Sequence, residues 1–248
     1  RDESFIDDLY GKFKGFSKFK GYIVCDCDGS IFKLPNTPTT KKAFDIPVDN
    51  IFERFLSRGR VSCMFDVHSN HILTSKITSR SFGEVKLAIE HLNNLNGRFN
   101  LKKVITIYDR GYPSIELMVK TIDLDSKFLI RLPKNVFKRQ INKMKTNDEI
   151  IKINIINSRL KAFDDENLKE KARQMGRLEI RIALVDIGKD EPEILATNLT
   201  PEEFTTEDLK ELYNKRWTIE TGFDRLKNLI EIEDFSGIRR RIIEQDFY

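Results

Sequence analysis

The sequence predicts an α/β protein, because strand-like and helix-like segments follow one another along most of the chain. Residues 20–35 and 104–114 are β-rich, and an amphipathic helical pattern lies between them at residues 82–96. The chain has 248 residues and 40% hydrophobic content, enough for one sizeable core with room for an inserted subdomain. A globular fold with a layered strand and helix organisation is therefore expected.

The first strands form a predicted three-stranded meander. The segment KGYIVCDCDGSIFKLP at residues 20–35 alternates in polarity, and the Asp28-Gly29 pair predicts that this strand ends or turns there. Residues 60–78, RVSCMFDVHSNHILTSKIT, then give two more strands around a polar turn at Ser69-Asn70.

The next segments alternate between helix and strand. Apolar residues recur with helical spacing over residues 82–96, and Gly97 is a helix stop signal. VITIYDRGYPS at residues 104–114 predicts a short buried strand with Asp109 at its end. A helix over residues 114–122 and a strand, KFLIRLP, over residues 127–133 complete this half.

The alternating pattern is lost after Leu132. We interpret residues 132–193 as a β-rich insertion, which divides the core into residues 1–131 and residues 194–248. After the return strand EILATNL, Thr200 is predicted to cap a helix that has Pro201 at its first position. A break at Thr205-Thr206 precedes a second predicted helix that extends to about residue 230.

Charge is unevenly distributed along the chain. The formal net charge is only +4, but residues 134–177 hold twelve basic and six acidic residues. A basic surplus of this kind suits the phosphate backbone of nucleic acid, and a solvated helix face gives the same pattern.

Three cysteines and the hydropathy pattern limit the setting of the protein. Cys25, Cys27 and Cys63 have no repeated spacing, which argues against a disulfide framework and favours a reducing compartment. No apolar run approaches the length of a membrane span or has the form of a secretory signal. The first residue is not methionine, so we expect a fragment of a longer protein.

The second predicted helix carries a polar stripe. With Tyr213 at zero, Arg216, Glu220 and Lys227 fall at roughly −60°, −20° and −40°, because each residue turns a helix by about 100°. An apolar face that begins with Leu212 lies beside the stripe. The stripe is therefore predicted at the margin of the buried surface, where a carboxylate needs a cation or a hydrogen-bonding partner.

Three carboxylates are candidate metal ligands. Asp28 and Asp109 end two predicted strands, and Glu220 lies on the helix. Such acids repel one another unless a divalent cation lies between them, and Mg²⁺ prefers oxygen ligands. Asp26 is the rival ligand to Asp28 because alternation places both side chains on one face, but the following Gly29-Ser30 favours Asp28.

These segments together resemble a known family. The spacing Tyr213-x2-Arg216-x3-Glu220-x6-Lys227 is similar to the Tyr-Arg-Glu-Lys (YREK) signature of bacterial insertion-sequence DDE transposases. CDCDGSIFKLP and IYDRGYPS resemble the segments that hold the first and second catalytic aspartates of that family. The resemblance extends from about residue 20 to the end and joins three separated segments in the expected order.

The resemblance implies a ribonuclease H-like core, a mixed sheet flanked by helices, with a β-rich insertion before the last catalytic helix. It implies metal-dependent cleavage and strand transfer of DNA in the bacterial cytoplasm, with two Mg²⁺ ions or Mn²⁺ in their place. The implied partners are double-stranded DNA, as transposon ends and target, and a second copy of the chain. The catalytic metal ligands would be Asp28, Asp109 and Glu220, and the DNA contacts Tyr213, Arg216 and Lys227.

Several alternatives remain open from sequence. Arg110 is either an ion-pair partner at the edge of the core or a DNA contact. A ribonuclease H-like nuclease that cuts without joining is the nearest alternative function. A catalytically inactive, adopted DNA-binding module is the alternative from another functional class.

Overall fold

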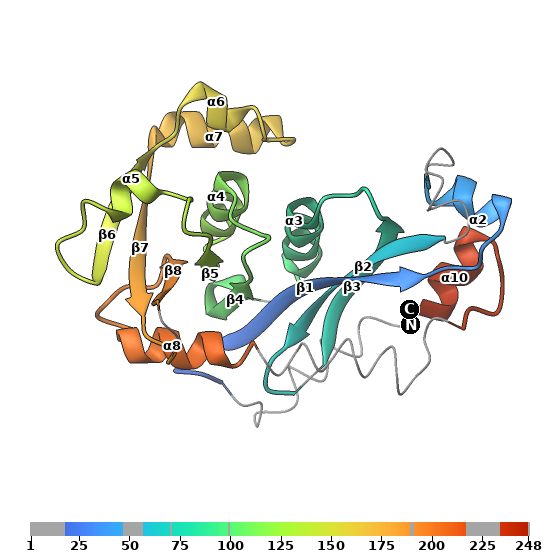
Figure 1. The fold of residues 1–248 in the computed structure, drawn as a ribbon, viewed down its shortest axis with the longest axis horizontal. Coiled ribbons are helices and arrows are strands. Elements are labelled where there is room, and N and C mark those ends of the chain that lie inside the picture. Colours follow the sequence, from blue (N-terminus) through green and yellow to red (C-terminus); the bar gives the residue numbers. More distant parts are fainter. Residues whose placement is uncertain are drawn as a thin grey trace.

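A computed structural model describes residues 18–46, 57–69, 71–98, 100–188, 191–216 and 234–247. Strands and helices alternate through this part of the chain (Figure 1). The strands are β1 (Ile23–Lys33), β2 (Arg58–Asp66), β3 (Ile72–Ser79), β4 (Val104–Tyr108), β5 (Lys127–Leu132), β6 (Asp148–Asn154), β7 (Arg177–Val185) and β8 (Glu193–Thr197). The helices are α2 (Pro38–Ala43), α3 (Glu84–Leu95), η1 (Leu101–Lys103), α4 (Ile115–Asp123), α5 (Lys138–Ile141), α6 (Asn157–Leu160), α7 (Glu166–Met175), α8 (Thr206–Asn214) and α10 (Arg240–Phe247).

All eight of these strands form one mixed sheet in the order β3-β2-β1-β4-β5-β8-β7-β6. β1, β4 and β5 run parallel to one another, and the other neighbouring pairs are antiparallel. The predicted α/β class, with a mixed sheet flanked by helices, is confirmed. The parallel trio lies in the middle of the sheet, where βαβ connections cover it with helices.

Helices cover both faces of the sheet. One core cluster joins Cys25 and Cys27 of β1 to α3, α4 and α7, and the other joins Val24 and Phe32 of β1 to α8 and α10. In Figure 1, α3 and α4 lie on one side of the sheet and α8 runs along the other. Side chains alternate along a strand, so the even-numbered residues of β1, including Asp26 and Asp28, belong to the α8 face.

The predicted meander is confirmed by β1, β2 and β3, but the predicted turn at Asp28-Gly29 is wrong. β1 continues to Lys33, and Asp28 and Gly29 pair with Cys63 and Ser62 of β2. The long antiparallel ladder outweighs the local turn preference of an Asp-Gly pair. Asp28 therefore lies within a strand rather than at its end.

The helices predicted between the first strands and β5 are confirmed within a few residues. α3 buries Leu87, Ala88, Leu92 and Leu95 on one face, and Gly97 follows it with a φ of +94°. That backbone conformation suits glycine and explains why the helix ends there. α4 begins where the Ser114 side chain accepts a hydrogen bond from the backbone N–H of Leu117.

The three cysteines are free thiols buried in the core. Cys25 and Cys27 belong to one core cluster and Cys63 to the other. All three therefore act as small packing residues of the core.

The residues predicted as an insertion extend the main sheet. Between β5 and β8 the chain forms β6 and β7 together with α5, α6 and α7. β7 pairs with β8, and β6 forms the sheet edge beyond it. The segment is attached to the central strands by a continuous backbone ladder.

The predicted helix start at Thr200 is wrong. Residues 201–203 form a turn, and α8 begins at Thr206 with Thr205 as its N-cap. Thr205 and Asp208 form a capping box, in which each side chain bonds the other residue's backbone N–H. This reciprocal pair satisfies two helix N–H groups and therefore prevails over the Thr200 and Pro201 signals.

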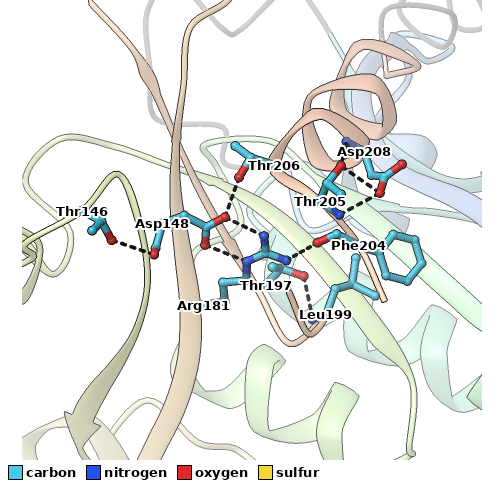
Figure 2. Close-up of polar contacts among 9 residues, drawn as sticks. All are labelled: Thr146, Asp148, Arg181, Thr197, Leu199, Phe204, Thr205, Thr206 and Asp208. Carbon is cyan, nitrogen blue, oxygen red and sulfur yellow. Dashed lines mark hydrogen bonds and ion pairs between the residues drawn. The ribbon is translucent and has the colours of Figure 1, made fainter. Parts of the chain in front are cut away.

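A buried ion pair fixes the start of α8 to the sheet edge (Figure 2). Arg181 of β7 donates to both carboxylate oxygens of Asp148 on β6, at 2.7 and 2.5 Å, and to the carbonyl oxygen of Phe204 at 2.6 Å. The Thr206 hydroxyl donates to Asp148 at 2.5 Å. β6 and β7 thus position the helix that carries Tyr213.

Candidate active site

The parallel pairing of β1 with β4 brings the two predicted catalytic aspartates together. Asp26 is in register with Ile107, so the next residue pair on the same face is Asp28 beside Asp109, directly after β4. The Asp109 carboxylate is close enough to Asp28 to help raise the pKa of Asp28, whose main cause is burial. Two segments separated by about eighty residues therefore meet at one place on the sheet.

The Asp28 side chain is partly buried and is hydrogen-bonded to the backbone of the next residue. Its Oδ1 accepts a hydrogen bond of 2.8 Å from the backbone N–H of Gly29. The pKa of Asp28 is raised to about 6, chiefly by burial and also by Asp109 and Glu84, while the Gly29 N–H and Arg216 act to lower it. The carboxylate is held in an environment that favours binding of positive charge.

Asp26 is a different kind of acid from Asp28. It is only 1% exposed, and neither carboxyl oxygen has a hydrogen-bond partner among the residues that the structure describes. Burial, and then the nearby Asp28, raise the pKa of Asp26 well above its ordinary value. Asp28 is the more exposed of the two carboxylates, which agrees with its choice as the candidate ligand.

Asp109 is held from the α8 side and from the β5 side. The Tyr213 hydroxyl donates to Asp109 Oδ1 at 3.0 Å, and Arg131 Nη1 lies 3.8 Å from the same oxygen. Arg131 is in turn fixed by Glu193, whose Oε2 accepts from Arg131 Nε at 2.5 Å. This network orients Asp109 before any ligand binds.

Sequence reasoning missed Arg131 and Glu193. The sequence did offer one signal for Arg131, because it is a single charged residue among the apolar residues FLIRL of this strand. Glu193 has a side chain only 6% exposed and lies sixty-two positions away, so no local pattern connects the two. Their pairing depends on the antiparallel contact of β5 with β8.

Arg110 follows Asp109 and points toward the same buried acid. Its Nη2 donates to Glu193 Oε2 at 2.9 Å, while about half of the side chain remains exposed. In the structure Arg110 is therefore an ion-pair partner, which is one of the two roles considered for it from the sequence. Its predicted contact with DNA stays a prediction.

Tyr213 and Arg216 face the two β1 aspartates and Asp109 from the last turn of α8 and the residues after it. They are 3% and 5% exposed, and the Arg216 guanidinium lies over the Tyr213 ring at 5.8 Å. The Arg216 charge lowers the pKa of both Asp26 and Asp28. In this structure Arg216 compensates negative charge at the sheet.

Glu220 and Lys227 lie in residues 217–233, outside the described part of the chain. Across the described ranges, no group of three His, Cys, Asp or Glu residues is arranged to hold a metal ion. The structure thus brings together two of the three predicted metal ligands and leaves the third as a prediction.

The comparison with protein families agrees with this arrangement. The sequence profile described as "Transposase DDE domain" matches residues 20–248, nearly the whole chain. The chain belongs to this family. A comparison with curated proteins found no matching sequence.

The transposase DDE domain also matches a solved transposase structure. The match is the cryo-EM structure of the piggyBac transposase synaptic complex with hairpin DNA, at 11% sequence identity and a TM-score of 0.46. The alignment covers 91% of this chain and 44% of that chain. The DDE domain described here therefore spans less than half the length of that protein.

The aspartates of the DDE domain fit a divalent cation. One carboxylate oxygen of Asp28 accepts a hydrogen bond from the Gly29 N–H, and one of Asp109 accepts from the Tyr213 hydroxyl. The second oxygen of each aspartate has no hydrogen-bond donor within the described ranges. Carboxylate oxygens are the ligands that Mg²⁺ prefers. Burial is the main cause of the raised pKa of Asp28, and a cation bound to these acids would also offset the smaller contribution from Asp109.

Glu84 is a further acid near the site of the DDE domain. It is the first residue of α3 and forms an ion pair with Arg60. Its carboxylate lies near Gly29, directly after Asp28, and near Gly111, two residues after Asp109. A Cβ at Gly111 would lie 3.0 Å from Glu84 Oε2, and one at Gly29 would lie 3.7 Å from Oε1. Glycine at these positions leaves room for the Glu84 carboxylate.

No helix in the described residues is long and apolar enough to cross a membrane.

Proposed function

We propose that this DDE domain cuts DNA at transposon ends and joins the freed 3′ ends to target DNA. The observation that carries the proposal is the juxtaposition of Asp28 and Asp109, with the Tyr213 hydroxyl bonded to Asp109. Family membership over residues 20–248 supports the same reaction class. Glu220, seven residues after Tyr213, is proposed as the third acid.

The residues proposed to hold two Mg²⁺ or Mn²⁺ ions are Asp28, Asp109 and Glu220. Such ions stabilise the attacking and leaving oxygens of an in-line phosphoryl displacement. The chain's own task is to keep the two aspartates oriented. The Tyr213 hydroxyl restrains Asp109, and Arg131, held by Glu193, supplies positive charge 3.8 Å from Asp109.

The proposed reaction has two displacements at phosphorus. In the first, a water oxygen bonds to phosphorus at the transposon end, the bond to the 3′-oxygen breaks, and that oxygen leaves as a 3′-hydroxyl. In the second, this 3′-oxygen attacks a target phosphodiester and releases a target 3′-hydroxyl. No covalent intermediate with the protein is required, so a site of carboxylates and cations suffices.

The YREK spacing supports a role for Tyr213, Arg216 and Lys227 in holding the transposon end, with Arg110 beside them. Arg216 and Tyr213 are buried before DNA arrives, so binding of DNA would have to compete with their present contacts. We further propose a catalytic core of residues 1–131 and 194–248, interrupted by the insertion at residues 132–193.

The partners that we propose are double-stranded DNA and a second copy of the chain that bridges two ends. We assign the reaction to the bacterial cytoplasm, where the nucleoid carries the element and thiols remain reduced. Three free, buried cysteines are in keeping with that assignment.

A strand-transfer assay tests the proposal. The protein would be incubated with Mg²⁺, a target plasmid, and a pre-cleaved duplex that carries the end of its own element. Joined product is expected from the wild type and should be lost in Asp28→Asn, Asp109→Asn and Glu220→Gln. Cutting without joining would support a nuclease instead, and binding without either reaction would support an inactive DNA-binding module.

A further inference from the structure

The basic surplus of residues 134–177 is concentrated in the connection from β5 to β6. Between Pro133 and Asn147 the chain carries five basic residues, Lys134, Lys138, Arg139, Lys143 and Lys145, and no acidic residue. This connection, which includes α5, is called the basic connection below. It accounts for nearly all of the six excess positive charges in that region.

Helix α7 in the same region shows the opposite arrangement. Its basic residues are paired with acids: Lys169 with Glu166, Lys171 with Asp123, and Arg173 with Glu170. The segment from Asp164 to Arg177 has as many acidic as basic residues. Its charges are therefore those of an ordinary solvated helix face.

The cations of the basic connection are exposed and largely uncompensated. Lys138, Arg139 and Lys143 are exposed and have no ion-pair partner within the described ranges. Lys134 is paired with Glu191, on a side chain that is itself 61% exposed. Such a surface attracts an anionic partner because Lys138, Arg139 and Lys143 are not neutralised within the described ranges.

The apolar residues of the basic connection point into the protein. Val136, Phe137, Ile141 and Met144 pack against the first core cluster. The backbone is also internally bonded, since the N–H groups of Gln140 and Ile141 both donate to the Phe137 carbonyl oxygen. The connection is thus an ordered platform that exposes cations and hides apolar groups, which favours a phosphate backbone over insertion into a membrane.

The basic connection begins at the edge of the sheet that carries Asp109. β5 runs parallel to β4, so their carboxyl ends lie on the same edge, and Asp109 directly follows β4. Arg131, three residues before Lys134, already approaches Asp109 at 3.8 Å. In Figure 1, α5 lies on the same side of the molecule as β6 and β7.

We propose that the basic connection binds the phosphate backbone of duplex DNA that extends beyond the reacting bond, with Lys138, Arg139 and Lys143 as the contacts. The inference rests on the DNA binding in the proposed function, because DNA must lie at the Asp28 and Asp109 site, and it does not depend on cutting or joining. The contacts are to phosphates and carry no sequence information. They would strengthen binding of any duplex that passes over this edge.

The test compares two triple variants that change the net charge equally. One is Lys138→Gln, Arg139→Gln and Lys143→Gln, and the control is Lys169→Gln, Lys171→Gln and Arg173→Gln on α7. Duplex affinity is measured by fluorescence anisotropy between 50 and 300 mM salt. If all three cations contact phosphates, the slope of log K against log salt should fall by about 2.7, from about 0.9 per contact in B-DNA.

The control variant should keep the wild-type slope, and both variants should keep the wild-type unfolding temperature. Equal slopes for the wild type and the first variant, or equal losses in both variants, would overturn the inference. Binding to anionic lipid vesicles that depends on the same three residues, with DNA binding unchanged, would overturn it as well. A wild type that binds DNA but neither cuts nor joins it would overturn the proposed function and leave this inference standing.

Discussion

The ion pair between Arg181 and Asp148 gives a quantitative test of how α8 is positioned. The Arg181 side chain is 3% exposed, and that of Asp148 is 24% exposed. Replacing Asp148 with alanine would leave the Arg181 charge buried without its carboxylate and would remove the acceptor of the Thr206 hydroxyl. Removing one partner of a buried ion pair costs about 3 to 5 kcal/mol.

The expected loss is large enough to measure by two methods. For a chain of this size, 1 kcal/mol corresponds to about 2 to 4 °C in unfolding temperature, so Asp148→Ala should unfold roughly 6 to 20 °C lower. Urea denaturation should show the same loss as a lower midpoint with an unchanged slope. The control is Lys152→Ala on the same strand, whose pair with Glu179 is exposed and should contribute less than about 1 kcal/mol.

Acid should reduce the difference between the wild type and Asp148→Ala. Burial alone raises the pKa of Asp148, but hydrogen bonds from Arg181 and Thr206 outweigh it and lower the pKa below its ordinary value. A lowered folded-state pKa stabilises the protein fully above about pH 4, and the stabilisation is lost as pH falls through the folded-state value. The variant lacks this contribution, so the two unfolding curves should converge in acid.

The double variant Asp148→Leu with Arg181→Met separates the charge from the packing. It should recover most of the stability that Asp148→Ala loses, because no buried charge is left without a partner. The reasoning is refuted if Asp148→Ala costs no more than Lys152→Ala, or if the double variant is less stable than Asp148→Ala.

Three further predictions concern other parts of the fold. Tyr213→Phe removes the hydroxyl bonded to Asp109, so single-turnover cleavage should slow about 10- to 100-fold, and an unchanged rate would contradict this. Burial lowers the pKa of His91 from 6.5 to about 4, so protonation of His91 destabilises the fold as pH falls below 6.5. Urea denaturation should show that the wild type loses about 2 to 3 kcal/mol of unfolding free energy between pH 7.5 and 4.5, whereas His91→Gln does not. Gly59→Ala places a Cβ 2.9 Å from Leu34 Cδ1 and 3.2 Å from the Thr78 carbonyl oxygen and should cost about 1 to 3 kcal/mol. Leu34→Ala should reduce that cost in the double variant by removing the first of these contacts.

Local patterns were sufficient to predict much of the fold. Helical spacing and a stop at Gly97 predicted α3, and the helical segment over residues 114–122 predicted α4. The alternation in residues 20–35 and 60–78 predicted β1, β2 and β3. These features are set by residues that are neighbours in the chain, so the sequence carries them directly.

The same local reasoning failed where a second set of residues formed better backbone hydrogen bonds than the predicted signal. Asp28-Gly29 has the composition of a turn, yet its pairing with β2 holds it within β1. Thr200 and Pro201 have the composition of a helix start, yet the Thr205 capping box determines where α8 begins. In the first case the decisive contact lies across the sheet and in the second it lies later in the chain, so the local signal alone was misleading.

The sequence by itself determined the α/β class, the order of the acidic motifs and the spacing of Tyr213 from Glu220. Only the tertiary structure decided that Asp28 and Asp109 lie side by side. It also decided that Arg131 lies close to Asp109 and is itself held by Glu193. The physical reason is that charges approach across strands whose pairing depends on the burial of whole faces. A one-dimensional pattern specifies which face a residue occupies, and the packing of the sheet decides which charges it meets there.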